Sequence, residues 1–376
     1  MILIGRPLLG IEEETAILEV LAAGQLAQGE RVAAFERRFA ELCSVKEAVA
    51  VSSGTAALHL ALIAHNIGPD DEVITTPFSF AATANTILLV GATPVFVDIE
   101  IDSYNLDPSL VEAAITPRTK AILPVHLYGN PCDMKRLVAI AKAHNLVLIE
   151  DACQAHAAAV NGKPVGSFST GCFSFYPTKN MTTGEGGMVT TNDPAIAEHV
   201  RILRNHGQKE RYCQVDLGYN LRMTEMQAAL GLVQIEKLEK FTERRIANAA
   251  FLTEYLSEVV QTPTARPGYR HVYHQYTIRV PGKRDEWMKI LHERGISTAI
   301  HYPLAIYQQP FYRASAHLYH ISIPVETHIV EESEMKQMQL PVVETAAKQV
   351  LSLPVHPALS MDELKKIVKE VRALCA

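Results

Sequence analysis

The chain has 376 residues, of which 48% are hydrophobic and 20% charged, and its formal net charge is −6. This composition is typical of a globular protein with a large core and about two domains. The negative charge disfavours a nucleic-acid-binding surface, and no apolar run reaches the ~18 residues of a membrane helix. The start, Met1 to Pro7, lacks the pattern of a signal peptide.

The six cysteines are scattered along the chain and form no CxxC pair. They are Cys43, Cys132, Cys153, Cys172, Cys213 and Cys375. This spacing disfavours a zinc site and a disulfide framework, so we expect no metal centre and a reducing, cytoplasmic location. His317 and His320 are three residues apart and could bind a metal if their segment were helical, but we expect a solvated loop there.

The first half of the chain alternates between strand and helix patterns. Residues 12–42 have helical periodicity that Gly24 and Gly29 interrupt, which predicts two helices around a turn. We expect strands at residues 48–52, 73–76, 94–98, 121–126, 146–150 and 187–191. We expect helices at residues 55–65, 133–144 and 194–203, and one that begins at Asp107-Pro108. This alternation predicts an α/β domain around a mostly parallel sheet.

The pattern changes after about residue 225. Residues 226–255 read as one long helix with mixed charges. A smaller α+β unit follows, with strands expected at 274–280, 297–300 and 350–353, helices at 285–293 and 361–374, and a long loop at 315–339. We therefore expect a large domain over residues 1–245, with a helical N-terminal segment, and a small C-terminal domain over residues 246–376.

A short motif, SSGTAA, spans Ser52 to Ala57 between a predicted strand and a predicted helix. Gly54 lets the backbone approach a ligand closely, and the helix start offers unpaired N–H groups that suit a phosphate. Ser53 and Thr55 add hydroxyl donors. An ordinary strand-to-helix turn with a serine cap would have the same sequence, so this motif alone leaves both interpretations open.

Two acids are adjacent at the end of the predicted buried strand at residues 146–150: Glu150 is its last residue, and Asp151 directly follows it. In α/β sheets, ligands bind at the carboxyl ends of the strands. An Asp there can pair with a protonated pyridine nitrogen and keep the ring an electron sink, whereas the plainer interpretation is a helix cap.

A lysine, Lys179, lies in the aromatic and glycine-rich stretch Phe173 to Gly187. A partly desolvated lysine has a lowered pKa, so it can be neutral and attack an aldehyde. The chain thus contains, in this order, a candidate phosphate-binding turn, a carboxylate that could bind a ring nitrogen, and a lysine that could act as a nucleophile. Together they match the requirements of pyridoxal 5′-phosphate (PLP).

The motifs from Gly29 to His356 resemble those of the DegT/DnrJ/EryC1/StrS family of sugar aminotransferases, which have the aspartate-aminotransferase fold, PLP fold type I. These motifs are SSGTAAL (Ser52–Leu58), EDACQAH (Glu150–His156), FSFYPTKN (Phe173–Asn180), GEGG (Gly184–Gly187), RNHG (Arg204–Gly207), GYNLRMTEMQAALG (Gly218–Gly231), HYP (His301–Pro303), QQPFY (Gln308–Tyr312) and LSLPVHP (Leu351–Pro357). The resemblance implies a large domain with a mostly parallel central sheet between helices and a smaller C-terminal α+β domain.

The resemblance also implies a role for each matching residue. Lys179 would form the internal aldimine and shuttle a proton, Asp151 would bind the pyridine nitrogen, and Gln154 would contact the ring or its 3-oxygen. Phe80 matches the aromatic residue that stacks on the ring.

The phosphate of the cofactor would have its own group of residues. Gly54, Thr55 and Ser174 would hold the phosphate, and Asn220 would reach the phosphate of the partner subunit's cofactor. The resemblance therefore implies a homodimer with its active sites at the interface.

The implied reaction has two stages. An amino acid, usually L-glutamate in this family, leaves its nitrogen on the cofactor as pyridoxamine 5′-phosphate, which then aminates the keto group of a nucleotide-linked sugar. This sequence departs from the family at Tyr307, where a His is expected after HYP, and residues 313–339 are longer than usual. Both departures lie in the predicted small domain, so they bear on the sugar rather than on the cofactor.

Three alternatives stay open in this interpretation. Sugar 3-dehydratases of the same fold replace the lysine with histidine, so Lys179 favours transamination. A keto-cyclitol is a rival acceptor that the motifs do not exclude. A non-catalytic PLP-binding regulator or accessory protein is the rival of a different class, although a binding module has no need of Lys179 with Asp151.

Overall fold

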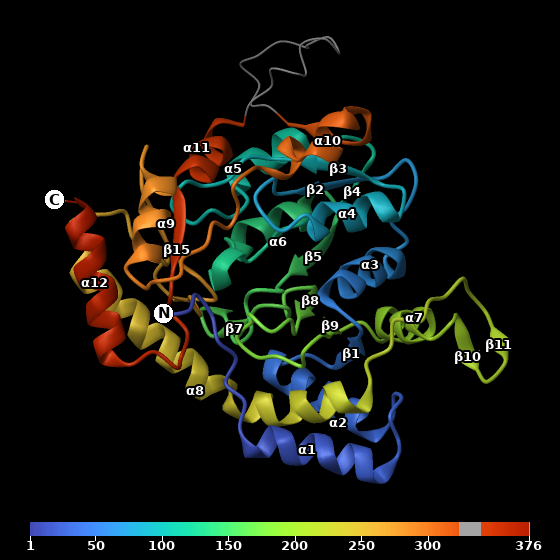
Figure 1. Cartoon of the computed structure of the whole chain (residues 1–376). Helices are drawn as coiled ribbons and strands as arrows, with labels where there is room; N and C mark the ends of the chain where they lie inside the picture. The colour runs from blue at the N-terminus through green and yellow to red at the C-terminus, as the bar shows by residue number, and fades with distance from the viewer. Residues whose placement is uncertain (323–339, 376) are drawn as a thin grey trace.

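The computed structural model describes residues 1–322 and 340–375. Its main feature is an eight-stranded sheet in the order β1-β9-β8-β5-β4-β2-β3-β14 (Figure 1). These strands are β1 Glu47–Val51, β2 Glu72–Thr75, β3 Thr93–Phe96, β4 Thr119–Leu123, β5 Val147–Asp151, β8 Thr170–Ser174, β9 Gly187–Thr191 and β14 His320–Ile321. Pairing is parallel throughout from β8 to β14, and only β9 runs antiparallel to both of its neighbours, β1 and β8. The prediction of a mostly parallel sheet is confirmed.

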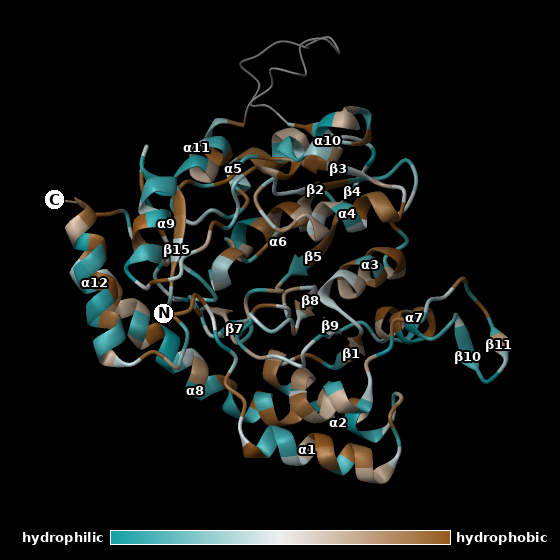
Figure 2. Ribbon diagram, in the orientation of Figure 1, coloured by the Kyte–Doolittle hydropathy of each residue, from teal (hydrophilic) through white to brown (hydrophobic). Residues whose placement is uncertain are grey.

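Helices cover both faces of this sheet, because residues on opposite faces of one strand pack in different cores. In β1, Val49 and Val51 belong to a core with α3, whereas Ala48 and Ala50 belong to a core with α2. Side chains alternate between the two faces along a strand, so the two helices lie on opposite sides. Figure 2 shows α3 almost wholly apolar, which fits its burial against the sheet.

Helices make up much of the rest of the chain. In order they are α1 Ile11–Ala23, α2 Glu30–Cys43, α3 Gly54–Ala64, α4 Ala82–Leu89, α5 Pro108–Val111, α6 Met134–Ala143, α7 Pro194–Arg204, α8 Glu225–Leu256, α9 Arg284–Glu293, α10 Pro310–Ala314, α11 Pro341–Gln349 and α12 Met361–Cys375. Short 3₁₀ turns are η1 Glu112–Ala114, η2 Leu127–Gly129, η3 Ile306–Gln308 and η4 Ala316–Leu318. No helix of the described residues is both long and apolar enough to cross a membrane.

A further core lies at the C-terminal end of the long helix α8. Strands β13 (Tyr276–Arg279) and β15 (Val350–Leu353) pair antiparallel, and α8, α9 and α12 pack around them. The predicted boundary between residues 245 and 246 falls within α8, which runs without interruption from 225 to 256. The N-terminal residue Ile2 also joins this core. The two-domain division stays a prediction.

Three small pairings complete the fold. Strands β6 (Ala159–Val160), β7 (Lys163–Pro164) and β12 (Tyr269–Arg270) form one sheet, and β10 (Gln208–Glu210) and β11 (Cys213–Gln214) form a hairpin. Figure 1 shows this hairpin extending away from the rest of the chain.

Two local predictions need correction. The strand expected at 297–300 is reduced to a single bridge between Ala299 and Ser352. The loop expected at 315–339 is wrong at its start, because η4 and β14 form there, and β14 pairs with the edge strand β3. Pairing with an edge that is distant in sequence is invisible to local periodicity. Residues 323–339 of that segment lie outside the described residues.

Candidate active site

The predicted cofactor residues gather at one edge of the large sheet. Asp151 ends β5 and Ser174 ends β8, which is parallel to β5, while Gly54 follows β1, which shares the direction of β8. Phe80 lies between β2 and α4, and β2 is parallel to the same set. Parallel strands end at the same edge, so four distant segments of the chain meet where α/β sheets bind ligands.

Asp151 is buried and held by hydrogen bonds from two directions. Its Oδ2 accepts from the Thr83 hydroxyl at 2.8 Å, and its Oδ1 accepts from the Cys153 N–H at 3.2 Å. The Ser79 hydroxyl lies 3.0 Å from that of Thr83. These contacts fix the carboxylate, and nothing in the sequence marked Thr83 as a member of this group.

Glu150 points away from Asp151, as alternate residues of a strand must. Its carboxylate is fully buried and accepts from the backbone N–H groups of Gly166 and Phe168 at 2.8 Å and of Ser169 at 3.1 Å. The ring of His126 donates to it at 3.2 Å. Glu150 therefore supports the loop that leads into β8, and Asp151 alone faces the site.

Lys179 follows β8 in a loop near Asp151. Burial lowers the pKa of its ammonium below the usual 10.5, while the neighbouring Cys153 and Asp151 oppose that shift. Within residues 1–322 and 340–375, its amine makes no hydrogen bond or ion pair. A desolvated and unpaired amine is what a nucleophilic lysine requires.

Gly54 begins α3 in close contact with Ser174. A Cβ at Gly54 would lie 2.6 Å from the Ser174 Cβ and 2.9 Å from the Cys153 sulfur, so a side chain would fill this cradle. The Ser53 hydroxyl caps α3 by accepting from the Ala56 N–H at 3.1 Å, and Thr55 is exposed beside it. The first N–H groups of a helix have no partner inside the helix, so this corner suits a phosphate.

Gln154 and Phe80 both lie near Tyr302. Gln154 Oε1 accepts from the Tyr128 N–H at 2.9 Å, and its Nε2 lies 3.3 Å from the Tyr302 hydroxyl. The ring of Phe80 is 63% exposed, and its centroid lies 6.5 Å from that of Tyr302. An aromatic face this exposed beside buried polar groups offers a stacking surface. These observations fit PLP, since they provide an amine, a carboxylate, a phosphate corner and an apolar face.

Within the part of the chain that the structure describes, no side-chain contact joins Asn220 to this group. It is exposed, lies at the foot of the hairpin β10–β11, and accepts from Arg222 Nε at 3.1 Å. Exposed apolar side chains lie on the hairpin, at Tyr212, and just after it, at Val215 and Leu217.

Tyr307, the departure from the expected histidine, is buried away from solvent. Its hydroxyl donates to Glu344 Oε1 at 2.9 Å and accepts from the Leu340 N–H at 3.3 Å, so it holds the start of α11. No local pattern indicates this role, because Tyr307 and Glu344 are far apart along the chain.

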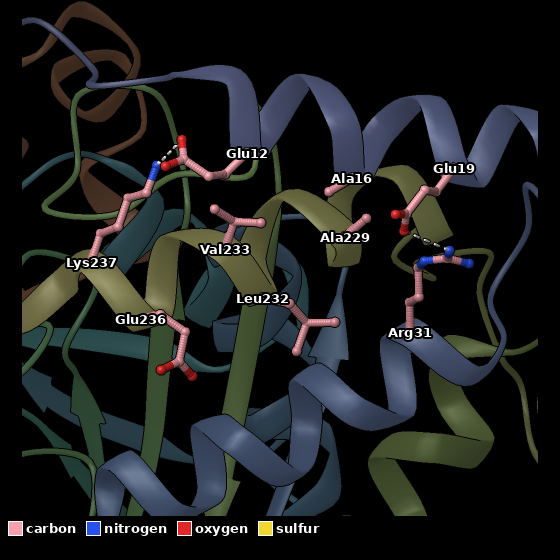
Figure 3. A pocket seen from close by; sticks show the side chains of 9 residues that line it. All are labelled: Glu12, Ala16, Glu19, Arg31, Ala229, Leu232, Val233, Glu236 and Lys237. Carbon is pink, nitrogen blue, oxygen red and sulfur yellow. Dashed lines mark hydrogen bonds and ion pairs between the residues drawn. The ribbon is translucent and has the colours of Figure 1, made fainter.

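A separate surface groove of about 430 Å³ lies between α1, α2 and α8 (Figure 3). Ion pairs from Glu12 to Lys237 and from Glu19 to Arg31 lie at its rim. None of the predicted cofactor residues lines it, so we do not place the chemistry there.

A family model matches nearly the whole chain and shows which family it belongs to. The model of the DegT/DnrJ/EryC1/StrS aminotransferase family matches residues 7–372. The chain belongs to this aminotransferase family. The resemblance inferred from the motifs is therefore confirmed, together with the fold type and the class of enzyme.

Individual relatives are similar over nearly their whole length. The chain is 44% identical to a pleiotropic regulatory protein of Geobacillus stearothermophilus, over 94% of this chain and 91% of that one. It is 42% identical to a UDP-N-acetyl-3-dehydro-α-D-glucosamine 3-aminotransferase of Acidithiobacillus ferrooxidans, over 95% of this chain and 92% of that one. Among solved structures, DesV of S. venezuelae with a ketimine intermediate is 39% identical, with a TM-score of 0.89. The match covers 97% of this chain and 94% of that one.

Proposed function

We propose that this aminotransferase uses PLP to move an amino group from an amino acid, L-glutamate in the first instance, to the keto group of a nucleotide-linked sugar. The convergence of the unpaired Lys179 amine with Asp151 at the carboxyl edge of the sheet carries this proposal. The relative from Acidithiobacillus, whose name states a keto-sugar substrate, supports the acceptor class.

Each residue then has a defined task. Bound PLP supplies an electron sink for the carbanion that forms when a proton leaves the amino-bearing carbon. Asp151, fixed by Thr83, would pair with the ring nitrogen of the cofactor. Lys179, whose pKa burial lowers, would hold the cofactor through its amine and would carry the proton between substrate and cofactor carbons.

The remaining binding tasks fall to residues of the surrounding segments. Gly54, Thr55 and Ser174 would hold the phosphate at the start of α3, Gln154 would contact the ring, and Phe80 would stack on it. Asn220 would serve the site of a partner subunit.

The placement of Asn220 supports a homodimer. Asn220 is exposed at the foot of a hairpin with an exposed aromatic residue, Tyr212, and among the described residues it makes no contact with the site of its own chain. A second copy of the chain would cover this hairpin and bring Asn220 to the neighbouring cofactor. We place this dimer in the cytoplasm, where the free cysteines stay reduced.

A non-catalytic regulator is the second candidate, because the Geobacillus relative bears the name of a regulatory protein. A regulator needs no nucleophilic lysine, whereas in this chain burial lowers the pKa of Lys179. A keto-cyclitol acceptor would use the same cofactor residues and differs only in the second half of the reaction.

The test is the absorption spectrum of the purified protein before and after addition of glutamate, with Lys179→Ala as the control. We expect the band of the lysine-linked cofactor to bleach in the wild type and no turnover in the variant. A band that no amino donor bleaches would favour the regulator. Incubation of the aminated form with nucleotide-linked keto sugars and keto-cyclitols would then separate the two acceptor classes.

A further inference from the structure

The side-chain amide of Gln154 is held at both of its ends. Its Oε1 accepts from the Tyr128 N–H at 2.9 Å, and its Nε2 donates to the Tyr302 hydroxyl at 3.3 Å. A backbone N–H is only a donor, so the oxygen of the amide must face Tyr128 and the nitrogen must face Tyr302. The two contacts therefore exclude the flipped amide.

The backbone of Gln154 is also constrained, as the contacts of Gly129 show. Gly129 has a φ of 87°, and a Cβ there would lie 3.0 Å from the Gln154 carbonyl oxygen. Only glycine fits a position that is both left-handed and this crowded. The segment of Tyr128 and Gly129 is therefore packed directly against Gln154, whose side chain starts from a fixed point.

Tyr302 comes from a segment that is anchored to the core at the C-terminal end of α8. The His301 carbonyl accepts from the Tyr128 hydroxyl, and His301 Nδ1 lies 3.0 Å from the Ser352 hydroxyl of β15. Ala299 also forms a bridge with Ser352. Other residues of β15 belong to the core that includes α9 and α12. The position of Tyr302 thus depends on the C-terminal part of the chain.

The ring of Tyr302 lies beside the aromatic residues of the site. Its centroid is 6.5 Å from that of the exposed Phe80 and 6.2 Å from that of the buried Phe78, to which it is perpendicular. Tyr302 is therefore next to both proposed contacts of the cofactor ring, Phe80 and Gln154.

The amide of Gln154 keeps one donor for a ligand. Its Nε2 carries two hydrogens, and one of them is used by the Tyr302 hydroxyl. Within residues 1–322 and 340–375, Nε2 makes no other hydrogen bond, although Gln154 is only 5% exposed. A buried donor without a partner is unfavourable, so we expect a bound ligand to supply the acceptor.

We propose that Tyr302 is a positioning residue, whose hydroxyl holds the Gln154 amide so that the second Nε2–H is available to the 3-oxygen of the cofactor. This role rests on the proposed function. Without the hydroxyl, the amide can turn about its last bond and lose the alignment of that donor. In the lysine-linked cofactor, the anionic 3-oxygen shares the imine proton. A donor to this oxygen therefore lowers the pH at which the imine loses its proton.

The titratable side chains around Tyr302 and Lys179 leave this proton observable. Burial lowers the pKa of His156 to about 3 and that of His301 to about 4, and it holds that of His274 well below 6.5. Burial raises the pKa values of the Cys153 thiol and of both tyrosine hydroxyls, so none of these groups titrates between pH 6 and 9.5. The full set is Tyr128, Asp151, Cys153, His156, His274, His301 and Tyr302.

The test is a pH titration, between pH 6 and 9.5, of the absorption band of the lysine-linked cofactor in full-length protein loaded with PLP. The midpoint reports the loss of the imine proton. In Tyr302→Phe, which removes only the hydroxyl, the midpoint should rise by about half a unit to one unit relative to wild type. In Gln154→Met, which removes the donor itself, it should rise at least as far.

The double variant separates positioning from direct contact with the cofactor. Tyr302→Phe should add no further shift in the Gln154→Met background, because a hydroxyl that acts through the amide has nothing left to position. Tyr307→Phe is the matched control, since its hydroxyl binds Glu344 and its loss should leave the midpoint at the wild-type value.

Two results would overturn this role while the proposed function stands. One is an unchanged midpoint in Tyr302→Phe, and the other is an equal shift from Tyr302→Phe with and without Gln154. Absence of the lysine-linked band in wild-type protein incubated with PLP would overturn both the role and the proposed function.

Discussion

Replacement of Glu150 by Gln tests whether the acid beside Asp151 is structural. The four groups that surround its carboxylate are all donors, since His126 Nδ1 accepts from the Cys132 N–H at 3.0 Å and its Nε2 must then carry the proton. Gln keeps one acceptor oxygen and turns an NH₂ group toward the other donors. Two hydrogen bonds to a charged acceptor are lost, at about 1.5–3 kcal/mol each.

The expected loss for Glu150→Gln is therefore about 3–6 kcal/mol, a large part of the ~5–15 kcal/mol that holds a typical domain folded. Urea unfolding followed by circular dichroism measures it. Glu112→Gln is the control, because Glu112 is exposed, pairs only with His144 at 3.3 Å, and should cost less than about 0.5 kcal/mol. A Glu150 variant within about 1 kcal/mol of wild type would refute this reasoning.

Three further changes have defined outcomes. Gly54→Ala should lower the free energy of unfolding by about 1–3 kcal/mol, because its Cβ would clash with Ser174, and should weaken the retention of PLP on dialysis. Gly5→Ala is the control: a Cβ there would meet nothing within 4 Å, so neither the free energy of unfolding nor the retention of PLP should change. Thr83→Val should cost about 1.5–3 kcal/mol in urea unfolding by removing a donor from a buried carboxylate, and no change would contradict its place in the site. Burial lowers the pKa of His301 to about 4, so the unfolded chain binds a proton that the folded chain does not. Between pH 6.5 and about 4, this group should lower the free energy of unfolding by about 1.4 kcal/mol per pH unit as the pH falls, and His301→Asn should reduce that slope.

Much of the architecture could be predicted from local patterns. Alternating strand and helix segments predicted the parallel sheet, Gly24 and Gly29 predicted the break between α1 and α2, and the long helix α8 was placed within a residue at each end. These features depend on side-chain periodicity and on backbone preferences, which act over short stretches of chain. The motifs around Lys179 also identified the family, because their residue types match one cofactor's chemistry.

Adjacent residues with the same chemistry could not be separated by local pattern. Glu150 and Asp151 are neighbours and both acidic, but they point to opposite faces of β5, so one caps backbone groups and the other reaches the site. Which face became the site depended on where α4 and Thr83 packed. Periodicity along one strand does not indicate which of its two faces lies at the site.

The sequence by itself determined most of the elements and the order of the strand and helix segments, and it predicted the residues that would hold PLP. Only the tertiary structure decided the partners of Thr83 and Tyr307, because each contacts a residue far away along the chain. The pairing of β14 with β3 has the same cause. Contacts between distant segments form only when the whole chain packs, so no short stretch of sequence indicates them.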